Sequence, residues 1–219
     1  FGSDEEYKPT VLIKDIEAKQ EGTHVQFTGR RVIGECIVLL PGSYHIFNAV
    51  PAAIISNDLG LTKQDFWDAL ATLPRSVASI QTYKFGKAIL LDDSYNSNPT
   101  GFHAALEVLS TYKKRHKIVV TRGMEELADR SDLLHDRVAG DIAFMADELV
   151  IISVDHEAQL RHGVVSEKYK TIVHTITDRA ELREYLLEKK DKEVAILLEN
   201  RLPMDVYEAV IEHTVPHDI

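Results

Sequence analysis

The feature that most constrains how this chain can fold is the alternation of apolar runs with amphipathic segments after residue 78. Short apolar runs predict strands at 79–84, 88–92, 117–121, 148–154, 171–175 and 193–199. Helical periodicity predicts helices at 99–113, 131–146, 157–161, 179–189 and 203–213. Such strand–helix–strand units predict an α/β fold, a Rossmann-like doubly wound and mostly parallel sheet. Because no Gly-x-Gly-x-x-Gly occurs, we expect no NAD site.

The residues before this alternation follow a different pattern. Three strand-like runs and two helical segments are predicted at 10–18, 24–28, 32–40, 44–59 and 62–73. Pro51 lies inside the first helical segment, where it predicts a kink or a late start. We therefore expect two domains, residues 1–78 and 79–219, with a boundary near Val77.

Composition limits the classes of function. The net charge of −10 disfavours a broad nucleic-acid surface, and no apolar run is long enough to span a bilayer. Cys36 is the only cysteine, so an internal disulfide is impossible and a reducing, cytoplasmic compartment is expected. The ten histidines show no metal-ligand spacing, and we expect no metal site. Phe1 opens the sequence without an initiator methionine, which indicates a piece of a longer protein.

The first candidate site is the polar loop Asp-Asp-Ser-Tyr-Asn-Ser-Asn-Pro at 92–99. It follows an apolar strand and ends at a proline, a residue favoured in the first turn of a helix. Loops of this kind lie at the carboxyl edge of a parallel sheet, where ligands bind. We expect this loop to line a site with Asp93, Tyr95, Asn96 and Asn98. The structural alternative is an ordinary polar connection.

Two more polar loops follow predicted strands. One has the sequence Thr-Arg-Gly-Met-Glu-Glu-Leu at 121–127, and the other has Glu-Asn-Arg-Leu-Pro-Met at 199–204. Parallel strands place such loops at one edge, so we expect these two to face one another.

The three loops together resemble the Mur ligases. The octapeptide at 92–99, followed by Ala-Ala-Leu-Glu at 104–107, is similar to the start of their C-terminal domain, and most of all to the MurF branch, which joins D-alanyl-D-alanine to UDP-N-acetylmuramoyl-tripeptide. The resemblance runs from about Val11 to Ala209 but covers only the rear half of such a ligase. It implies that residues 1–78 are the tail of the central ATPase domain and residues 79–219 the C-terminal domain.

The resemblance also implies nucleotide contacts. Pro-Gly-Ser-Tyr-His-Ile-Phe-Asn-Ala at 41–49 is similar to a family motif beside adenine, although Tyr44 and His45 depart from its usual His-Asn pair. Leu-Pro-Arg-Ser at 73–76 falls where the family has Pro-Gly-Arg, whose arginine reaches the ribose or phosphate. Here the arginine, Arg75, comes one residue early. The implied nucleotide-binding residues are His45, Asn48, Arg75, Asp93, Tyr95, Asn96 and Asn98. Asn48 is equally expected as a hydrogen-bonding residue at a helix start, and Arg75 as a surface charge.

In the family the second loop borders the incoming amino acid or dipeptide. In the third loop, Arg201 can hold a carboxylate by a charge-assisted contact, which suits an amino-acid acceptor. The implied substrate-binding residues are Arg122, Met124, Glu125, Glu126, Asn200 and Arg201. The alternatives are a charged surface loop in which Glu126 only orients backbone, and a solvated Arg201. His135, in the helix after the second loop, matches a family histidine, although a lone helical histidine is more often structural.

The implied reaction uses ATP and Mg²⁺, with UDP-MurNAc-peptide and D-Ala-D-Ala as the partner molecules. No Gly-x-x-x-x-Gly-Lys-Ser/Thr loop occurs, since Gly86-Lys87 is followed by Ala88. We expect the triphosphate and Mg²⁺ to be held largely by a preceding part of the protein, and this chain alone to be an inactive monomer with no identified catalytic residue. The alternatives are a non-catalytic scaffold module and a ligase for another muramyl or folate-type acceptor.

Overall fold

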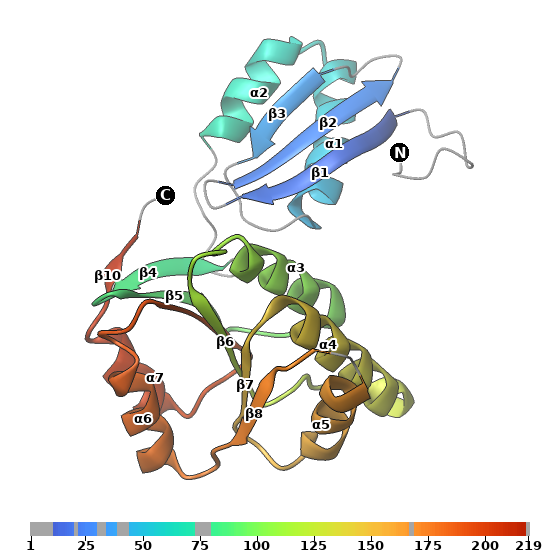
Figure 1. Cartoon of the computed structure of the whole chain (residues 1–219). Coiled ribbons are helices and arrows are strands. Elements are labelled where there is room, and N and C mark those ends of the chain that lie inside the picture. Colours follow the sequence, from blue (N-terminus) through green and yellow to red (C-terminus); the bar gives the residue numbers. More distant parts are fainter. Residues whose placement is uncertain are drawn as a thin grey trace. The chain divides into compact units, whose positions relative to one another are not determined.

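The computed structural model describes residues 11–19, 22–29, 34–38, 44–72, 80–166 and 169–217. The chain divides into two compact units, residues 1–79 and 80–219, which are described separately (Figure 1). Arg75 and Val77 lie outside the described residues, as do the side chains of Tyr44 and His45.

The first unit is an antiparallel sheet packed against two helices. The three predicted strands are β1 (Val11–Lys19), β2 (Gly22–Gly29) and β3 (Gly34–Val38), and they pair in that order as antiparallel neighbours. The helices are α1 (Tyr44–Asp58) and α2 (Lys63–Ala71). Their buried side chains form one core with those of β1 and β2.

The ends of the two helices follow local chemistry. α1 begins at Tyr44 with Pro51 inside it, so the alternative of a late start was wrong. It is closed by Gly60, whose φ of +88° suits glycine, with hydrogen bonds from Gly60 and Leu61 back to the last turn. Thr62 caps α2 in a capping box with Asp65.

The second unit is the predicted doubly wound sheet. Its strands are β4 (Gln81–Phe85), β5 (Ala88–Asp93), β6 (His116–Thr121), β7 (Glu148–Ile151), β8 (Ile172–Thr175), β9 (Val194–Glu199) and β10 (Val215–Pro216). The strand order is β10-β4-β5-β9-β6-β7-β8. The five strands from β5 to β8 in this order are parallel, while β4 and β10 are antiparallel additions at one edge.

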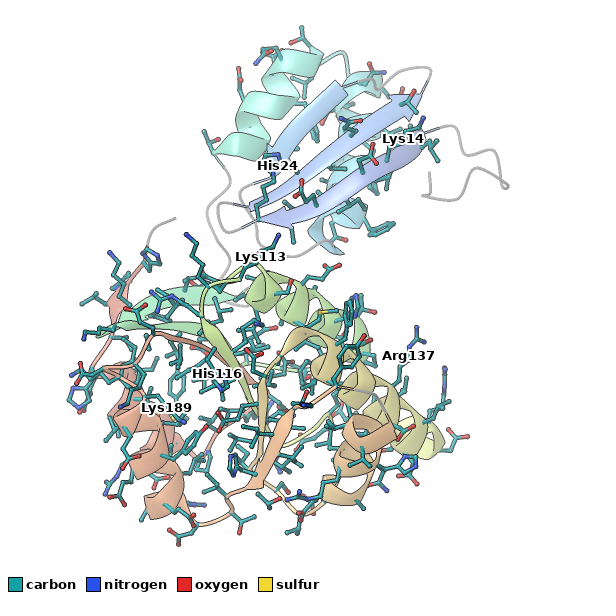
Figure 2. The ribbon with its side chains drawn as sticks, viewed as in Figure 1. Lys14, His24, Lys113, His116, Arg137 and Lys189 are labelled. Atoms are coloured by element: carbon teal, nitrogen blue, oxygen red, sulfur yellow. The ribbon has the colours of Figure 1, made fainter. Side chains whose placement is uncertain are left out.

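Helices cover both faces of this sheet. They are α3 (Pro99–Ser110), α4 (Ser131–Met145), α5 (Glu157–Ser166), α6 (Arg179–Glu188) and α7 (Met204–Ile211), with a short 3₁₀ helix, η2 (Ala128–Arg130), before α4. One core contains α3, α4 and α5, and the other contains α6 and α7. Figure 2 accordingly shows Arg137 of α4 and Lys189, just after α6, on opposite sides of the sheet. None of the helices in the described part is long and apolar enough to cross a membrane.

Two element ends differ from the predictions for local reasons. β7 ends at Ile151 instead of Val154, because Ser153 and Asp155 form a turn through their side chains and Val154 is exposed. α5 continues beyond residue 161 to Ser166, where Leu160 and Val164 pack one helical turn apart in the core.

The helix that follows β9 lies on the opposite face of the sheet from the helices that follow its neighbours, β5 and β6. The chain leaves β5 and β6 for α3 and α4 on one face, and leaves β9 for α7 on the other. β9 lies between β5 and β6, so the polypeptide turns to opposite faces on leaving adjacent strands. In doubly wound sheets ligands bind outside the carboxyl ends of strands at such a switch point.

Candidate functional site

The three polar loops meet at this switch point, and Asn200 joins them. Its side-chain Nδ2 donates a 2.6 Å hydrogen bond to the carbonyl oxygen of Gly123, in the loop after β6. Its backbone N–H points to the carbonyl oxygen of Asp93 at 3.4 Å, where the loop after β5 begins. The second and third loops therefore do lie side by side, as expected from the sequence.

Asn200 adopts an uncommon backbone conformation to make these contacts. Its φ is +63°, in the left-handed region that asparagine tolerates better than most residues, and its side chain is buried. Its Oδ1 also accepts a hydrogen bond from the backbone N–H of Arg201 at 2.8 Å. Asn200 is thus fully engaged in shaping the loops, while the side chain of Arg201 is exposed.

The first loop presents some of its predicted residues and uses others structurally. Tyr95 and Asn96 are exposed. Asn98 is the N-cap of α3, and its Oδ1 accepts a 2.9 Å hydrogen bond from the N–H of Gly101. The loop therefore offers Tyr95 and Asn96 to solvent above a capped helix.

Asp93 and Glu199 face each other where β5 and β9 end. They are register partners in the parallel ladder, and Glu199 is fully buried. Burial and the charge of Asp92 raise the pKa of Asp93 to about 6. Burial, followed by the proximity of Asp93, raises the pKa of Glu199 well above its ordinary value. One oxygen of Glu199 accepts a 2.6 Å hydrogen bond from Ser97.

Asp92 points away from this pair and has its own partners. Tyr207 of α7 donates a 2.7 Å hydrogen bond to its Oδ2, and its Oδ1 accepts one from the N–H of Ser94 at 3.1 Å. Burial and these contacts with Asp92 raise the pKa of Tyr207. Asp92 is therefore committed to holding α7 and the start of the first loop.

The second loop places its charges outside and its methionine inside. Arg122 forms an ion pair of 3.3 Å with Glu125, and both side chains are partly exposed. Glu126 is exposed, with a φ of +62°. Met124 is almost completely buried in the core, so its side chain anchors the loop and is not presented to a ligand.

His135 fixes the backbone of this loop. Its Nε2 accepts a 2.8 Å hydrogen bond from the N–H of Met124, and its Nδ1 lies 2.8 Å from the carbonyl oxygen of Ser131. A carbonyl only accepts and an N–H only donates, so the proton sits on Nδ1. Burial is the main cause that lowers the pKa of this histidine, which keeps it neutral. Its ring stacks on His156 at 3.9 Å, and its role is structural.

Gly123 is required at the close approach to these rings. Its φ is +92°, and a Cβ atom there would lie 2.8 Å from Nε2 of His135 and 2.9 Å from Cδ2 of His156. Any side chain would therefore displace the carbonyl to which Asn200 donates.

The remaining predicted residues belong to the first unit. Asn48 is exposed in the first turns of α1. Because α1 begins at Tyr44, Asn48 lies a full turn inside the helix and not at its start, and its contact with a ligand stays a prediction. Among the described residues no group of histidine, cysteine, aspartate or glutamate side chains forms a metal site.

Sequence reasoning missed Glu199 and Ser97 as members of the site. Both are polar and buried, and the only available signal was a glutamate that closes an otherwise apolar strand. Glu199 belongs to the site because β9 lies next to β5, and no local sequence pattern predicts that strand order.

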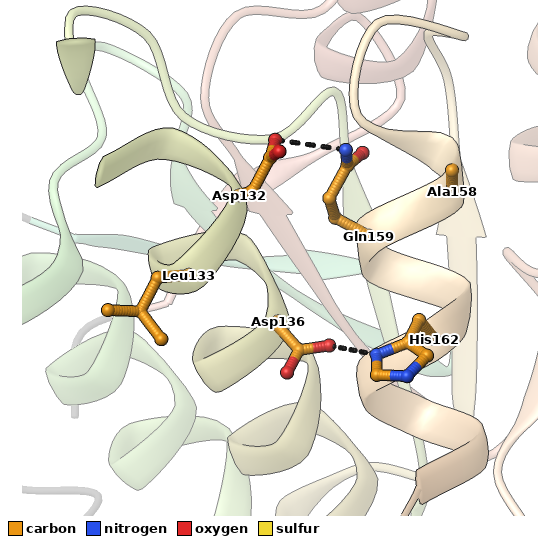
Figure 3. Close-up of a pocket in the computed structure, with 6 residues that line it drawn as sticks. All are labelled: Asp132, Leu133, Asp136, Ala158, Gln159 and His162. Carbon is orange, nitrogen blue, oxygen red and sulfur yellow. Dashed lines mark hydrogen bonds and ion pairs between the residues drawn. The ribbon is translucent and has the colours of Figure 1, made fainter. Parts of the chain in front are cut away.

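A pocket of about 390 Å³ lies elsewhere, between α4 and α5 (Figure 3). Its acidic residues are already engaged, since Asp132 accepts a 2.9 Å hydrogen bond from Gln159 and Asp136 lies 2.5 Å from Nδ1 of His162. None of the predicted site residues lines it.

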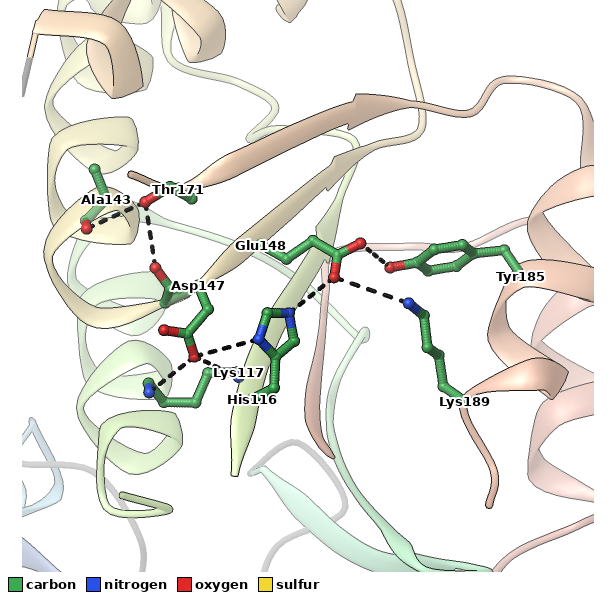
Figure 4. A network of polar contacts seen from close by, with 9 residues as sticks. His116, Lys117, Ala143, Asp147, Glu148, Thr171, Tyr185 and Lys189 are labelled. Atoms are coloured by element: carbon green, nitrogen blue, oxygen red, sulfur yellow. Dashed lines mark hydrogen bonds and ion pairs between the residues drawn. The ribbon is translucent and has the colours of Figure 1, made fainter. Parts of the chain in front are cut away.

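A polar network also occupies the opposite, amino edge of the sheet (Figure 4). Glu148 is nearly buried and contacts His116 at 3.0 Å, His174 at 3.3 Å and Lys189 at 3.8 Å. Tyr185 donates a hydrogen bond to the same carboxylate. Burial alone would raise the pKa of Glu148, but the Tyr185 and His116 hydrogen bonds and the nearby cations lower it overall. This network ties β6, β7, β8 and α6 together.

Comparison with known proteins identifies the family to which the second unit belongs. Residues 80–199 match the family model described as Mur ligase, glutamate ligase domain. The chain belongs to the Mur ligase family. The predicted resemblance is therefore confirmed.

This Mur ligase chain is similar to enzymes named UDP-N-acetylmuramoyl-tripeptide–D-alanyl-D-alanine ligase. It is 24% identical over 202 residues to that of Bacillus subtilis (strain 168), which covers 90% of this chain and 43% of the relative. With that of Escherichia coli (strain K12) it shares 33% identity over 149 residues, 66% of this chain and 32% of the relative. The Mur ligase chain thus spans less than half the length of these relatives.

Solved structures agree on the fold. MurF from Acinetobacter baumannii superposes with a TM-score of 0.75 at 19% identity, covering 93% of this chain and 45% of that one. MurF from Thermotoga maritima in complex with ADP gives a TM-score of 0.68 at 20% identity, with the same coverage of 93% and 45%.

Proposed function

We propose that the protein containing this chain is an ATP-dependent ligase that adds D-alanyl-D-alanine to UDP-N-acetylmuramoyl-tripeptide. In this reaction ATP transfers its terminal phosphoryl group to the tripeptide carboxylate, which gives an acyl phosphate and ADP. The amine of the dipeptide then attacks the acyl phosphate, forms the amide bond and releases phosphate. We assign to the present portion the binding of the adenosine end of ATP and the positioning of the acceptor dipeptide. The names of the two curated relatives described above support this substrate pair.

The single observation that carries the proposal is the hydrogen bond from Asn200 to Gly123. It brings the loop with Arg122 beside the loop with Arg201, next to the carboxyl end of β5 that bears Asp93. A zwitterionic dipeptide needs a cation for its carboxylate and a carboxylate for its ammonium group, and these loops supply both kinds of charge. Holding the amine in place lowers the entropic part of the barrier.

Arg122 can serve without rebuilding the loop. Its ion pair with Glu125 is partly exposed, and exposed pairs contribute little to stability. An incoming carboxylate can therefore replace Glu125 as the partner of the guanidinium, which leaves Glu125 and Glu126 to face the ammonium group.

On the nucleotide side, Asp93 is the residue we assign to the ribose hydroxyls. Its carboxylate is half-buried and ionises within the neutral range, so it can accept two hydrogen bonds. Exposed Tyr95 and Asn96 flank it in the same loop. Because the sequence contains no Gly-x-x-x-x-Gly-Lys-Ser/Thr loop, we assign the triphosphate and Mg²⁺ to a part of the protein outside this chain.

The decisive experiment is kinetic and uses the protein that contains this chain. Arg122→Ala and Arg201→Ala should raise the KM for D-alanyl-D-alanine by about ten- to a hundredfold, the loss of one charge-assisted contact, and leave the KM for ATP nearly unchanged. Arg183→Ala, at an exposed position on α6, is the matched control. Unchanged acceptor kinetics in both variants would refute the acceptor assignment, and turnover with a different amino acid would reassign the acceptor.

A further inference from the structure

The buried carboxyl group of Glu199 lacks the partners that a buried carboxylate needs. Its register partners are Asp93 on β5 and Thr121 on β6, so an acid lies on one side and a hydroxyl residue on the other. In the part of the chain that the structure describes, no lysine, arginine or histidine forms an ion pair with Glu199 or Asp93. An ionised pair buried in this way would be strongly unfavourable.

The two oxygens of Glu199 show how the conflict is resolved. Oε1 accepts the hydrogen bond from Ser97. Oε2 is buried and finds no N–H or hydroxyl donor among the described residues. A proton on the carboxyl group of Glu199 satisfies this oxygen, because it can be donated to the carboxylate of Asp93.

We infer that Glu199 is a positioning residue that acts as a neutral carboxylic acid: it donates a hydrogen bond to Asp93, accepts one from Ser97, and so holds the nucleotide-side carboxylate and its loop in place. The role of Asp93 in this inference rests on the proposed function, whereas the protonation of Glu199 does not. The adjacent Asn200 holds the acceptor-side loop through Gly123. Two consecutive residues at the end of β9, Glu199 and Asn200, therefore support both halves of the site.

The titratable groups near this pair have partners of their own. Asp92, the nearest further acid, is held by Tyr207 and by the N–H of Ser94, and Tyr83 of β4 also lies near Asp92. Burial and Asp92 raise the pKa of Asp93, and the hydrogen bond from Glu199 counteracts that rise. Removing the donor should therefore make Asp93 harder to ionise.

The conservative replacement makes a sharp test. Glutamine copies a neutral glutamic acid, because its Oε1 can accept from Ser97 and its amide can donate to Asp93. Leucine fills similar space and can do neither. If Glu199 acted as a carboxylate, Glu199→Gln would be as damaging as Glu199→Leu.

The first measurement needs no enzyme activity. In this 219-residue chain with ¹³C-labelled glutamate side chains, NMR titration should show one carboxyl group still protonated at neutral pH, and Glu199→Gln should remove that signal. Finding every glutamate ionised at neutral pH would overturn the inference. Because this result does not involve substrates, it stands apart from any failure of the ligase assignment.

The second measurement is the KM for ATP against pH in the protein that contains this chain. Glu199→Leu should raise this KM about tenfold, as expected for losing a hydrogen bond to a charged group, and should move the midpoint of its pH dependence upward. Glu199→Gln should restore both the KM and the midpoint, and the acceptor KM should change less than the ATP KM in each variant. A Glu199→Gln variant that is as impaired as Glu199→Leu, or a midpoint unmoved in Glu199→Leu, would refute the positioning role.

Discussion

Nε2 of His116 lies 3.0 Å from Oε2 of Glu148, a carboxylate whose side chain is only 6% exposed. The contact joins the first residue of β6 to the first residue of β7, and Tyr185 and Lys189 add α6 to it. The amino edge of the sheet is therefore held by charge, whereas its centre is held by apolar packing.

Glu148→Gln should destabilise the second unit by about 1 to 3 kcal/mol, the range for hydrogen bonds to a charged group. The lowered pKa of Glu148 means that its contribution is present above the unfolded pKa and is lost as pH falls through the folded pKa. The difference from the wild type should thus be largest near neutrality and shrink in acid. Denaturant unfolding followed by far-UV circular dichroism measures it.

A control accompanies this variant. Glu184→Gln, on an exposed part of α6, should change little. Equal stability of Glu148→Gln and the wild type at neutral pH would show that the network adds nothing.

Asn200 should tolerate glycine better than alanine. Both replacements remove the hydrogen bond to Gly123. A φ of +63° is sterically unfavourable for alanine, which has a Cβ atom, but not for glycine. Asn200→Ala should therefore be less stable than Asn200→Gly by about 1 kcal/mol. At Asn57, inside α1, the order should reverse, because alanine is the better helix former. The same ranking at both positions would contradict the conformational explanation.

Asp93→Asn should increase stability while weakening nucleotide binding. A carboxyl group whose folded pKa is raised to about 6 contributes stability below its unfolded pKa and loses it as pH rises through 6. Above pH 6 the free energy of unfolding of the variant should therefore exceed that of the wild type by on the order of 2 kcal/mol. This difference should close towards pH 4. Thermal unfolding across this range tests it, with the exposed Asp191→Asn as control. A gap independent of pH would exclude the titration of Asp93 as its cause.

The isolated 219-residue chain should neither hydrolyse ATP nor form the amide bond. It contains no Gly-x-x-x-x-Gly-Lys-Ser/Thr loop to neutralise the triphosphate charge. Phosphate release by the purified chain with ATP and Mg²⁺ is the measurement, and an Asp93→Ala variant prepared in parallel separates real turnover from contamination. Turnover that Asp93→Ala reduces would disprove the prediction.

The fold was predictable because its signals are local. The apolar runs of β5 and β9 and the Pro99 start of α3 specify elements without reference to distant residues. Strand order is not local: β9 enters between β5 and β6, and only that insertion places Glu199 beside Asp93. Burial was equally hidden at Met124, which occupies a charged loop yet packs in the core.

The two residues of β10 close the edge of the sheet beyond β4. Val215 pairs with Lys84 and Pro216 with Tyr83, and the N–H of His217 donates to the carbonyl oxygen of Thr82 at 2.9 Å. An open strand edge is a template on which other molecules can add strands and aggregate. β10 covers the open edge of β4. Its own outer edge offers few backbone hydrogen-bonding groups, because the strand is only two residues long and Pro216 has no N–H. At this edge of the sheet, resistance to intermolecular β-pairing thus depends on a segment that adds almost nothing to the core.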